Sequence, residues 1–220
     1  MEAKQKLGLI GRNISYSFSK KYFEDKFQKL IINNYSYEIF DLQDVSEVEN
    51  LFEDPELLGF NVTIPYKEKI KKYLDELKKK TKKIGAVNCV KIENGIKTGY
   101  NTDATGFEKT LLLHLKSHHK SAIILGNGGA AKAVKYVLDK MQIQNITVAR
   151  SSEEFNFKNI SVETVKQHTV IIQTTPVGTF PNVYDCLDFP FDGITERHLI
   201  LDLIYNPNYT KFIIKASEKG

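Results

Sequence analysis

The sequence has few cysteines and no long apolar run, and both shortages exclude classes of protein. Its two cysteines, Cys89 and Cys186, form neither a disulfide framework nor a metal-binding spacing. No apolar stretch approaches the roughly 20 residues that a membrane-spanning helix needs. Residues 1–11 carry charges where a secretion signal would need an apolar run. These features together predict a cytoplasmic protein that does not bind a membrane.

The sequence also lacks a concentrated block of charge. Its 31 basic and 27 acidic residues leave a net charge of +4, and no basic block is interleaved with aromatic residues. The longest charge run, residues 77–83, is typical of the solvated face of a helix. We therefore expect no nucleic-acid partner. We expect no metal either, because His114 and His118 are four apart but Leu115 replaces the glutamate of a zinc-protease motif.

Short apolar runs and amphipathic segments alternate over the first hundred residues, which is typical of an α/β domain. Strands are predicted at residues 6–11, 35–42 and 59–63. Residues 19–30 predict a helix with Ser19 as its N-cap. The apolar face of that helix would consist of Tyr22, Phe23, Phe27 and Leu30.

Helical pattern follows at residues 44–52 and again from about Lys67 through Lys83. Asn94–Gly95 predicts a hairpin turn, because both residue types tolerate a positive φ. A further helix is predicted from about Asp103 to His114.

Beyond residue 120 the predicted strands become continuously apolar, with helical pattern between them. Their sequences are SAIIL, NITVAR, TVIIQTT and LILDLIY. Such strands indicate a parallel sheet that is buried on both faces. We therefore predict two domains, an α/β domain at residues 1–103 and a doubly wound, Rossmann-like domain at residues 104–220.

A glycine turn joins the first of these apolar strands to a helix. Gly126, Gly128 and Ala131 form a G-x-G-x-x-A pattern in the strand–turn–helix context that dinucleotide binding requires. Gly126 permits the tight turn, Gly128 lets the backbone approach a pyrophosphate, and Ala131 permits close packing of helix on strand. The free N–H groups at the helix N-terminus favour the phosphates.

The residues after the next strand discriminate between NAD and NADP. An NAD site usually has an acidic residue there, whereas this sequence has Arg150 and Ser151. An arginine can bind a 2′-phosphate and stack on adenine, so the sequence predicts NADP. Glu153 and Glu154 count against a strongly phosphate-seeking pocket.

Polar side chains follow the predicted strands of the first domain. Ser17 and Ser19 are two residues apart, so their hydroxyls would point the same way in an extended chain, and Asn61 and Thr63 repeat the spacing. Asn88 and Asp103 add an amide and a carboxylate. The serines alone are more typical of a cap or turn than of a binding site. The convergence of the whole set at strand ends favours a small ligand rich in hydroxyl groups.

The ordered set of motifs resembles the shikimate dehydrogenase family over essentially the whole chain. The matching segments are GRNISYSFSKKYF, GFNVTIPYKE, GAVNCV, GYNTDATGF, ILGNGGAAKAV, TVAR, QTTPVGT and DLIYNPNYTKF. The resemblance implies an N-terminal substrate domain and an NADP domain. It also implies NADPH-dependent reduction of 3-dehydroshikimate to shikimate, on the route to chorismate and the aromatic amino acids.

The resemblance also implies a role for each matching residue. Lys67 and Asp103 would form the catalytic pair, which suits general acid–base chemistry at a carbonyl. The substrate would be bound by Ser17, Ser19, Asn61, Thr63, Lys67, Asn88, Asp103 and Tyr205. The cofactor would be bound by Gly126, Asn127, Gly128, Gly129, Ala130, Arg150, Ser151 and Leu203. Whether Lys67 carries the proton or acts mainly through its charge stays open.

The sequence departs from the family in three ways. The family often has Asn where Ala149 stands and a basic residue where Glu153 and Glu154 stand, which weakens the expected NADP preference. Family members also continue past the segment that ends at Gly220. The resemblance thus implies either that the given sequence is part of a longer protein or that the family's C-terminal segment is lacking, and weak shikimate binding and low activity are expected only in the second case.

Two other functions stay open at this point. A quinate/shikimate dehydrogenase using NAD would more often carry an acid in place of Arg150. A catalytically impaired dinucleotide-binding member would be expected to have lost Lys67 or Asp103, and both are present. The chain is expected to be a monomer or a homodimer.

Overall fold

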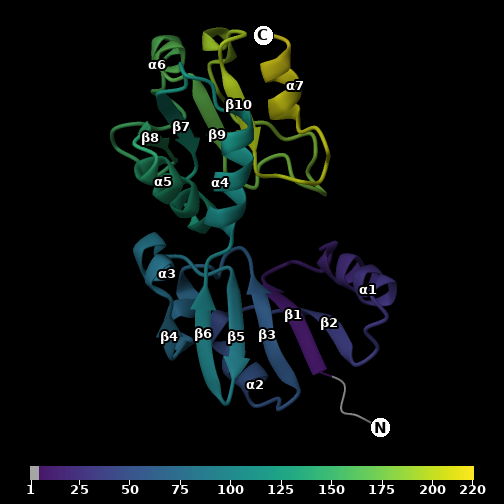
Figure 1. Ribbon diagram of the computed structural model, residues 1–220. Coiled ribbons are helices and arrows are strands. Elements are labelled where there is room, and N and C mark those ends of the chain that lie inside the picture. Colours follow the sequence, from purple (N-terminus) through teal and green to yellow (C-terminus); the bar gives the residue numbers. More distant parts are fainter. Residues whose placement is uncertain (1–4) are drawn as a thin grey trace. The chain divides into compact units, whose positions relative to one another are not determined.

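The computed structural model describes residues 5–220 and divides the chain into two compact units, Met1–Thr102 and Asp103–Gly220. This division falls one residue before the boundary expected from the sequence. The first unit contains β1 (Gln5–Gly11), α1 (Ser19–Lys29), β2 (Tyr35–Asp41), α2 (Val48–Phe52), β3 (Leu57–Val62), β4 (Glu76–Leu77), α3 (Lys79–Ile84), β5 (Cys89–Glu93) and β6 (Ile96–Tyr100). The second contains α4 (Asp103–His114), β7 (Ser121–Leu125), α5 (Gly129–Lys140), β8 (Gln144–Val148), α6 (Val162–Gln167), β9 (Val170–Gln173), β10 (Leu199–Asp202) and α7 (Lys211–Ser217). Within residues 5–220, short 3-10 helices lie at Val45–Glu47, Lys69–Tyr73 and Phe191–Gly193 (Figure 1 labels the α-helices and β-strands).

The first unit is built on a mixed sheet with the strand order β2-β1-β3-β5-β6-β4. β1 is parallel to both β2 and β3, whereas β5 is antiparallel to β3 and to β6. The hairpin predicted at Asn94–Gly95 is confirmed, because these two residues join β5 to β6 with φ angles of +52° and +77°.

Apolar side chains cover both faces of this sheet. On one face Phe23 and Phe27 of α1 pack against Leu9 and Tyr37 of β1 and β2. The opposite face contributes Ile10, Phe60 and Val62 to a larger core. The two cores follow from the alternation of side chains along a strand, since Leu9 and Ile10 are neighbours in β1.

Two details of the predicted α1 helix are wrong. Ser19 is the first helical residue and Phe18 occupies the N-cap position, so Ser19 does not cap the helix. Tyr22 is 60% exposed and Leu30 57% exposed, which leaves only Phe23 and Phe27 of the predicted apolar face against the sheet. A helix that rests on the edge of a sheet buries a narrower stripe than the sequence pattern offers.

The predicted helix through Lys83 is also wrong. The strand ends at Val62 rather than Thr63, and Lys67 lies in a turn that precedes the 3-10 helix. β4 interrupts the helical pattern, and α3 carries only the last part of it. Lysine-rich segments are compatible with turns as well as helices. The hydrophobic periodicity of the sequence therefore could not distinguish the turn, the 3-10 helix, β4 and α3 from one continuous helix.

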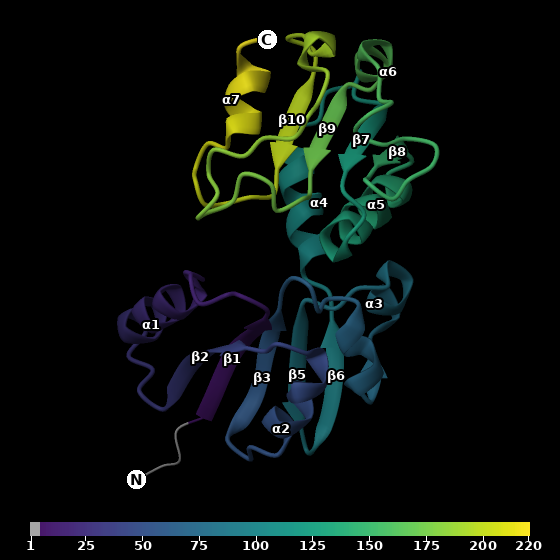
Figure 2. The same cartoon turned by 180° about the vertical axis from the view of Figure 1, so that it is seen from behind.

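The second unit contains a parallel sheet with the order β10-β9-β7-β8, as the apolar strands predict. Helices lie on both of its faces, as a comparison of Figures 1 and 2 shows. Val165 of α6 and Phe212 of α7 share one core with Ile123 and Ile171 of the sheet. α4 packs against α5, which in turn contacts β7 and β8. This is the doubly wound α/β arrangement expected from the sequence.

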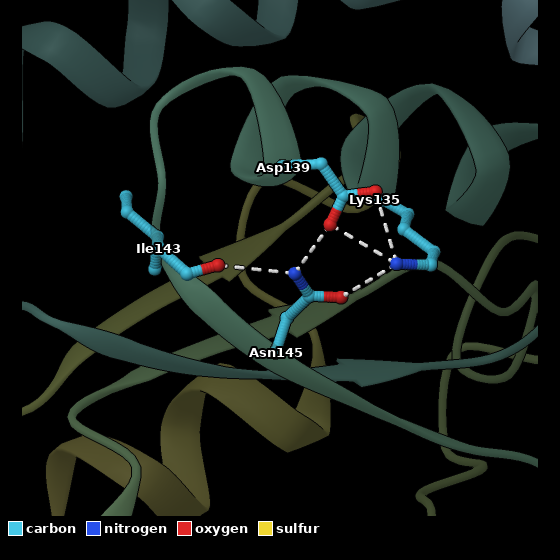
Figure 3. Close-up of polar contacts among 4 residues, drawn as sticks. All are labelled: Lys135, Asp139, Ile143 and Asn145. Atoms are coloured by element: carbon cyan, nitrogen blue, oxygen red, sulfur yellow. Dashed lines mark hydrogen bonds and ion pairs between the residues drawn. The ribbon is translucent and has the colours of Figure 1, made fainter.

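A polar network ties the C-terminal half of α5 to the start of β8 (Figure 3). Lys135 Nζ lies 3.0 Å from both carboxylate oxygens of Asp139, and the Asn145 amide donates to Asp139 Oδ1 at 2.9 Å and to the Ile143 carbonyl at 3.0 Å. Burial raises the pKa of Asp139, but the hydrogen bonds from Asn145 and Lys135 outweigh it and lower the pKa on balance. The network therefore favours the charged carboxylate at neutral pH.

Among residues 5–220, no helix is both long enough and apolar enough to cross a membrane.

Candidate active site

The topology of the first sheet gathers its polar residues at one edge. β1 and β3 are parallel and end at the same edge, where the antiparallel strand β5 begins and β6 ends. Thr63 follows β3, Asn88 precedes β5, and Thr102 follows β6. Residues far apart in the sequence thus lie at one edge of this unit, as expected for a binding site.

Asn88 is fixed by a pair of hydrogen bonds to Thr102. The Thr102 N–H donates to Asn88 Oδ1 at 2.8 Å, and Asn88 Nδ2 donates to Thr102 Oγ1 at 2.7 Å. Asn88 is only 8% exposed, so both bonds are shielded from water. The sequence reasoning missed Thr102, although it lies in the same NTD motif as Asp103.

Asn61 lies at the end of β3 and is held from two sides. Its Oδ1 accepts a hydrogen bond from the Tyr37 hydroxyl at 2.9 Å, and its Nδ2 approaches the Asn88 carbonyl oxygen at 3.5 Å. Thr63 follows after one residue, and its N–H donates to the Ile10 carbonyl at 2.9 Å. The structure therefore places Asn61, Thr63 and Asn88 close together.

Ser17 and Ser19 lie where the loop after β1 enters α1. Their hydroxyls are 3.2 Å apart, and Ser17 Oγ accepts the Ser19 N–H at 3.3 Å. The hydroxyls meet because the chain turns into a helix, and not because it is extended as the spacing argument assumed. Both carboxylate oxygens of Asp41 hold the start of this loop, through the N–H groups of Asn13 at 2.7 Å and Ile14 at 3.0 Å.

Lys67 is half-buried in the turn that follows β3. Its carbonyl oxygen accepts the N–H of Val87 at 2.7 Å, which ties the lysine backbone to the residue before Asn88. Lys69, two residues later, is exposed at the start of the 3-10 helix. The two lysines thus differ in burial, which the sequence pattern could not show.

Asp103 is the first residue of α4 in the second unit and directly follows Thr102. A carboxylate in the first turn of a helix is stabilised by the exposed N–H groups and the dipole of that helix. Asp103 therefore lies at the start of α4, and the residue before it is anchored by Asn88.

The second unit places its predicted cofactor residues at the carboxyl edge of the parallel sheet. The glycine turn follows β7, Arg150 and Ser151 follow β8, and Leu203 and Tyr205 follow β10. The order β10-β9-β7-β8 changes direction between β7 and β9, and ligands of such sheets bind outside the strand ends at this point.

The glycines of the turn are required for two different reasons. Gly126 has a φ of +111°, and a Cβ there would lie 2.7 Å from Thr174 Oγ1 and 3.0 Å from Thr175 Cγ2. Gly128 has an ordinary φ of −79° as the N-cap of α5, and a Cβ there would meet no atom within 4 Å. The fold therefore requires glycine at position 126 but not at position 128. Because a side chain at position 128 would occupy the space beside the backbone, glycine there is suited to the close approach of a phosphate. Sequence reasoning missed Thr174 and Thr175.

A side-chain hydrogen bond links the glycine turn to the residues after β8. Asn127 Nδ2 donates to Ser151 Oγ at 2.9 Å. Arg150 is exposed next to Ser151 in the sequence. Its guanidinium is therefore accessible to an anionic ligand from solvent. Asn127, Gly128, Arg150 and Ser151 together suit the phosphate groups of a dinucleotide.

The loop after β10 is held by a half-buried carboxylate. Asp202 accepts the Ile204 N–H at 2.9 Å and the Thr210 hydroxyl at 2.6 Å. Burial raises the pKa of Asp202, and these two hydrogen bonds oppose that rise. Leu203 and Tyr205 in this loop are 40% and 70% exposed, which leaves their side chains available to a ligand.

Over the described residues, no group of three or more histidine, cysteine or acidic side chains is placed to hold a metal ion.

Comparison with known proteins identifies the family. The family model described as the shikimate dehydrogenase substrate binding domain matches residues 9–90. A shikimate dehydrogenase (NADP(+)) of Methanococcus maripaludis is 38% identical over 242 residues, which covers 100% of this chain and 85% of the relative.

Solved structures agree with these sequence matches. The shikimate dehydrogenase of Aquifex aeolicus has a TM-score of 0.84 and 33% identity, covering 99% of this chain and 84% of its own. A shikimate dehydrogenase crystallised with NADP+ has a TM-score of 0.83 and 30% identity, covering 98% of this chain and 82% of its own. The chain therefore belongs to the shikimate dehydrogenase family, whose NADP-dependent members are oxidoreductases acting on a CH–OH group.

Proposed function

We propose that this protein reduces 3-dehydroshikimate to shikimate with NADPH, as a step toward chorismate and the aromatic amino acids. The observation that carries the proposal is the similarity to NADP-dependent shikimate dehydrogenases over essentially the whole chain. In this proposal the first unit binds the substrate and the second unit binds the cofactor. The family model for substrate binding supports the first half of that division, since it ends before the second unit begins.

The cofactor would be held by the carboxyl edge of the parallel sheet. The backbone from Gly126 to Ala130 would bind the pyrophosphate, and Arg150 with Ser151 would bind the 2′-phosphate. The open space beside Gly128 and the Asn127–Ser151 hydrogen bond support this assignment. Leu203 would lie near the nicotinamide. NADP(H), when bound, supplies or accepts the hydride.

The proposed substrate-binding residues of the first unit lie at the carboxyl end of its sheet, and those of the second unit are Asp103 and Tyr205. Ser17 and Ser19 would bind the carboxylate, because their adjacent hydroxyls can both donate to one anion. The ring hydroxyls would be bound by Asn61, Thr63, Asn88 and Asp103, and Tyr205 would contact the substrate.

Lys67 and Asp103 would carry out the proton transfer. Reduction of a ketone forms an alkoxide, which needs a proton as the C–H bond is made, and oxidation of shikimate needs a base for the hydroxyl proton. An ammonium group beside the reacting oxygen would stabilise the alkoxide and donate the proton. A carboxylate that accepts the hydroxyl hydrogen bond would orient the same oxygen.

The test is shikimate-dependent reduction of NADP+, followed as NADPH absorbance. Lys67→Ala and Asp103→Asn should each lower kcat by about 10²- to 10⁴-fold, the usual contribution of an acid–base group. Lys69→Ala is the matched control and should leave kcat within about twofold, because exposed charges away from the site contribute little. Absence of any shikimate-dependent rate in the unsubstituted protein would refute the proposal. Equal kcat/KM values for NADPH and NADH would refute the assignment of Arg150 and Ser151.

A further inference from the structure

A deeply buried tyrosine lies under α1 in the first unit. Tyr37 of β2 is 2% exposed, and its ring stacks on Phe23 with 4.3 Å between the ring centroids and 8° between the ring planes. Its hydroxyl donates a hydrogen bond to Asn61 Oδ1 at 2.9 Å. A buried phenol needs such a partner, but the partner here is a residue of the candidate substrate site.

Two contacts together fix which way the Asn61 amide faces. With Oδ1 bonded to Tyr37, the amide nitrogen faces the Asn88 carbonyl oxygen at 3.5 Å. A flipped amide would place Oδ1 against that carbonyl, and two acceptors would repel each other. The Asn88 carbonyl, which can only accept, therefore selects this orientation, and the hydrogen bond from the Tyr37 hydroxyl holds the amide in it.

The selected orientation makes Asn61 a donor. A primary amide nitrogen carries two N–H groups, and the Asn88 carbonyl can use one of them. At 3.5 Å that contact is long for a hydrogen bond, so it constrains the amide less than the Tyr37 bond does.

We propose that Tyr37 is a positioning residue that holds Asn61 as a hydrogen-bond donor, so that the substrate oxygen recognised by Asn61 must be an acceptor. The inference rests on the proposed function, since it needs Asn61 in the substrate site. A hydroxyl or carbonyl oxygen satisfies the requirement, whereas an ammonium group, which can only donate, does not.

Steady-state kinetics of Tyr37→Phe test the inference. The phenylalanine keeps the stack on Phe23 and removes only the hydroxyl. We expect the KM for shikimate to rise about fivefold, the effect of one lost net hydrogen bond, with kcat and the KM for NADP+ within about twofold. Tyr35→Phe is the matched control, because Tyr35 lies two residues earlier on the same face of β2 and its ring contacts Phe27. Its kinetic constants should equal those of the unsubstituted protein.

A double-mutant cycle separates positioning from general stability. In an Asn61→Ala background, Tyr37→Phe should cause no further rise in KM, because the hydroxyl acts only through Asn61. An undiminished effect in that background would overturn the inference, as would Tyr37→Phe kinetics equal to those of Tyr35→Phe.

Asn61→Asp provides a test that leaves Tyr37 intact. The aspartate still accepts the Tyr37 hydroxyl but has no N–H group, so its KM for shikimate should rise at least as much as that of Asn61→Ala. An unchanged KM for Asn61→Asp would overturn the inference even if Tyr37→Phe failed to fold. An unsubstituted protein without shikimate-dependent turnover would refute the proposed function itself, which is a different outcome.

Discussion

The two glycines of the nucleotide-binding turn should respond differently to the same substitution. Gly126→Ala forces an alanine to a φ of +111° and places its Cβ 2.7 Å from Thr174 Oγ1. Thr174 cannot move away freely, because its hydroxyl donates to the Leu125 carbonyl at 2.7 Å. Gly128→Ala meets neither obstacle, since its φ is −79° and no atom lies within 4 Å of the new Cβ.

The magnitudes follow from these geometries. Backbone strain at a positive φ costs about 1–3 kcal/mol and overpacking a similar amount, so Gly126→Ala should lower the free energy of unfolding by about 3 kcal/mol. Gly128→Ala should lower it by no more than about 1 kcal/mol, the effect of a poorer N-cap residue. Gly128→Ala should also weaken NADPH binding about 10- to 100-fold, since the added methyl group obstructs one charge-assisted hydrogen bond from the backbone to a phosphate.

Two measurements check the prediction. Urea unfolding followed by circular dichroism gives the stability, and NADPH fluorescence gives the Kd without interference from tryptophan, which the sequence lacks. Gly106→Ala in α4 is the control, because no atom lies within 4 Å of its Cβ and alanine is the better helix former by about 1 kcal/mol. It should raise stability slightly and leave the Kd unchanged. Wild-type stability in Gly126→Ala, or wild-type NADPH affinity in Gly128→Ala, would refute the reasoning about the corresponding glycine.

Two further predictions concern stability. Asn88→Ala removes both hydrogen bonds to Thr102 and should lower the free energy of unfolding, measured by urea unfolding, by about 2 kcal/mol. Asn88→Asp should lower it by less, because the Thr102 hydroxyl can rotate and donate to the carboxylate. Equal decreases in the two variants would contradict this account. His119 is 5% exposed, its Nδ1 accepts the Lys116 N–H at 2.9 Å, and burial lowers its pKa below the usual 6.5. As the pH decreases, the His119 imidazole is protonated in the unfolded chain before it is protonated in the folded protein. The contribution of His119 to the free energy of unfolding is therefore complete above pH 6.5, and at lower pH it decreases by up to about 1.4 kcal/mol per pH unit. His119→Asn should flatten the dependence of unfolding free energy on pH between 6.5 and 5, and an unchanged slope would contradict the assignment.

Local sequence signals predicted much of the second unit. Its apolar strands, the glycine turn and the helix after it appear at the expected places, because each depends on neighbouring residues alone. The hairpin at Asn94–Gly95 was predictable for the same reason. The segment from Lys67 to Lys83 was not, since its lysines fit a turn, a 3-10 helix and a short α-helix equally well.

The candidate site was predicted less completely than the fold. Residue types and motifs pointed to Asn61, Thr63 and Asn88, but nothing in the sequence showed that Thr102, Tyr37 and Asp41 hold their neighbours in place. Tyr37 lies 24 residues before Asn61, and Asn88 lies 14 residues before Thr102. Contacts over such separations depend on which strands pair and in which register.

The sequence by itself determined the residues that can do chemistry: the two serines, the amides, Lys67, Asp103 and the glycine turn with Arg150. It determined these because hydrogen-bonding capacity, charge and backbone freedom belong to each residue type. Only the tertiary structure decided how Asn61 and Asn88 are oriented and which glycine the fold itself requires. These properties arise from strand pairing, which brings distant side chains within hydrogen-bonding distance and places Thr174 beside Gly126.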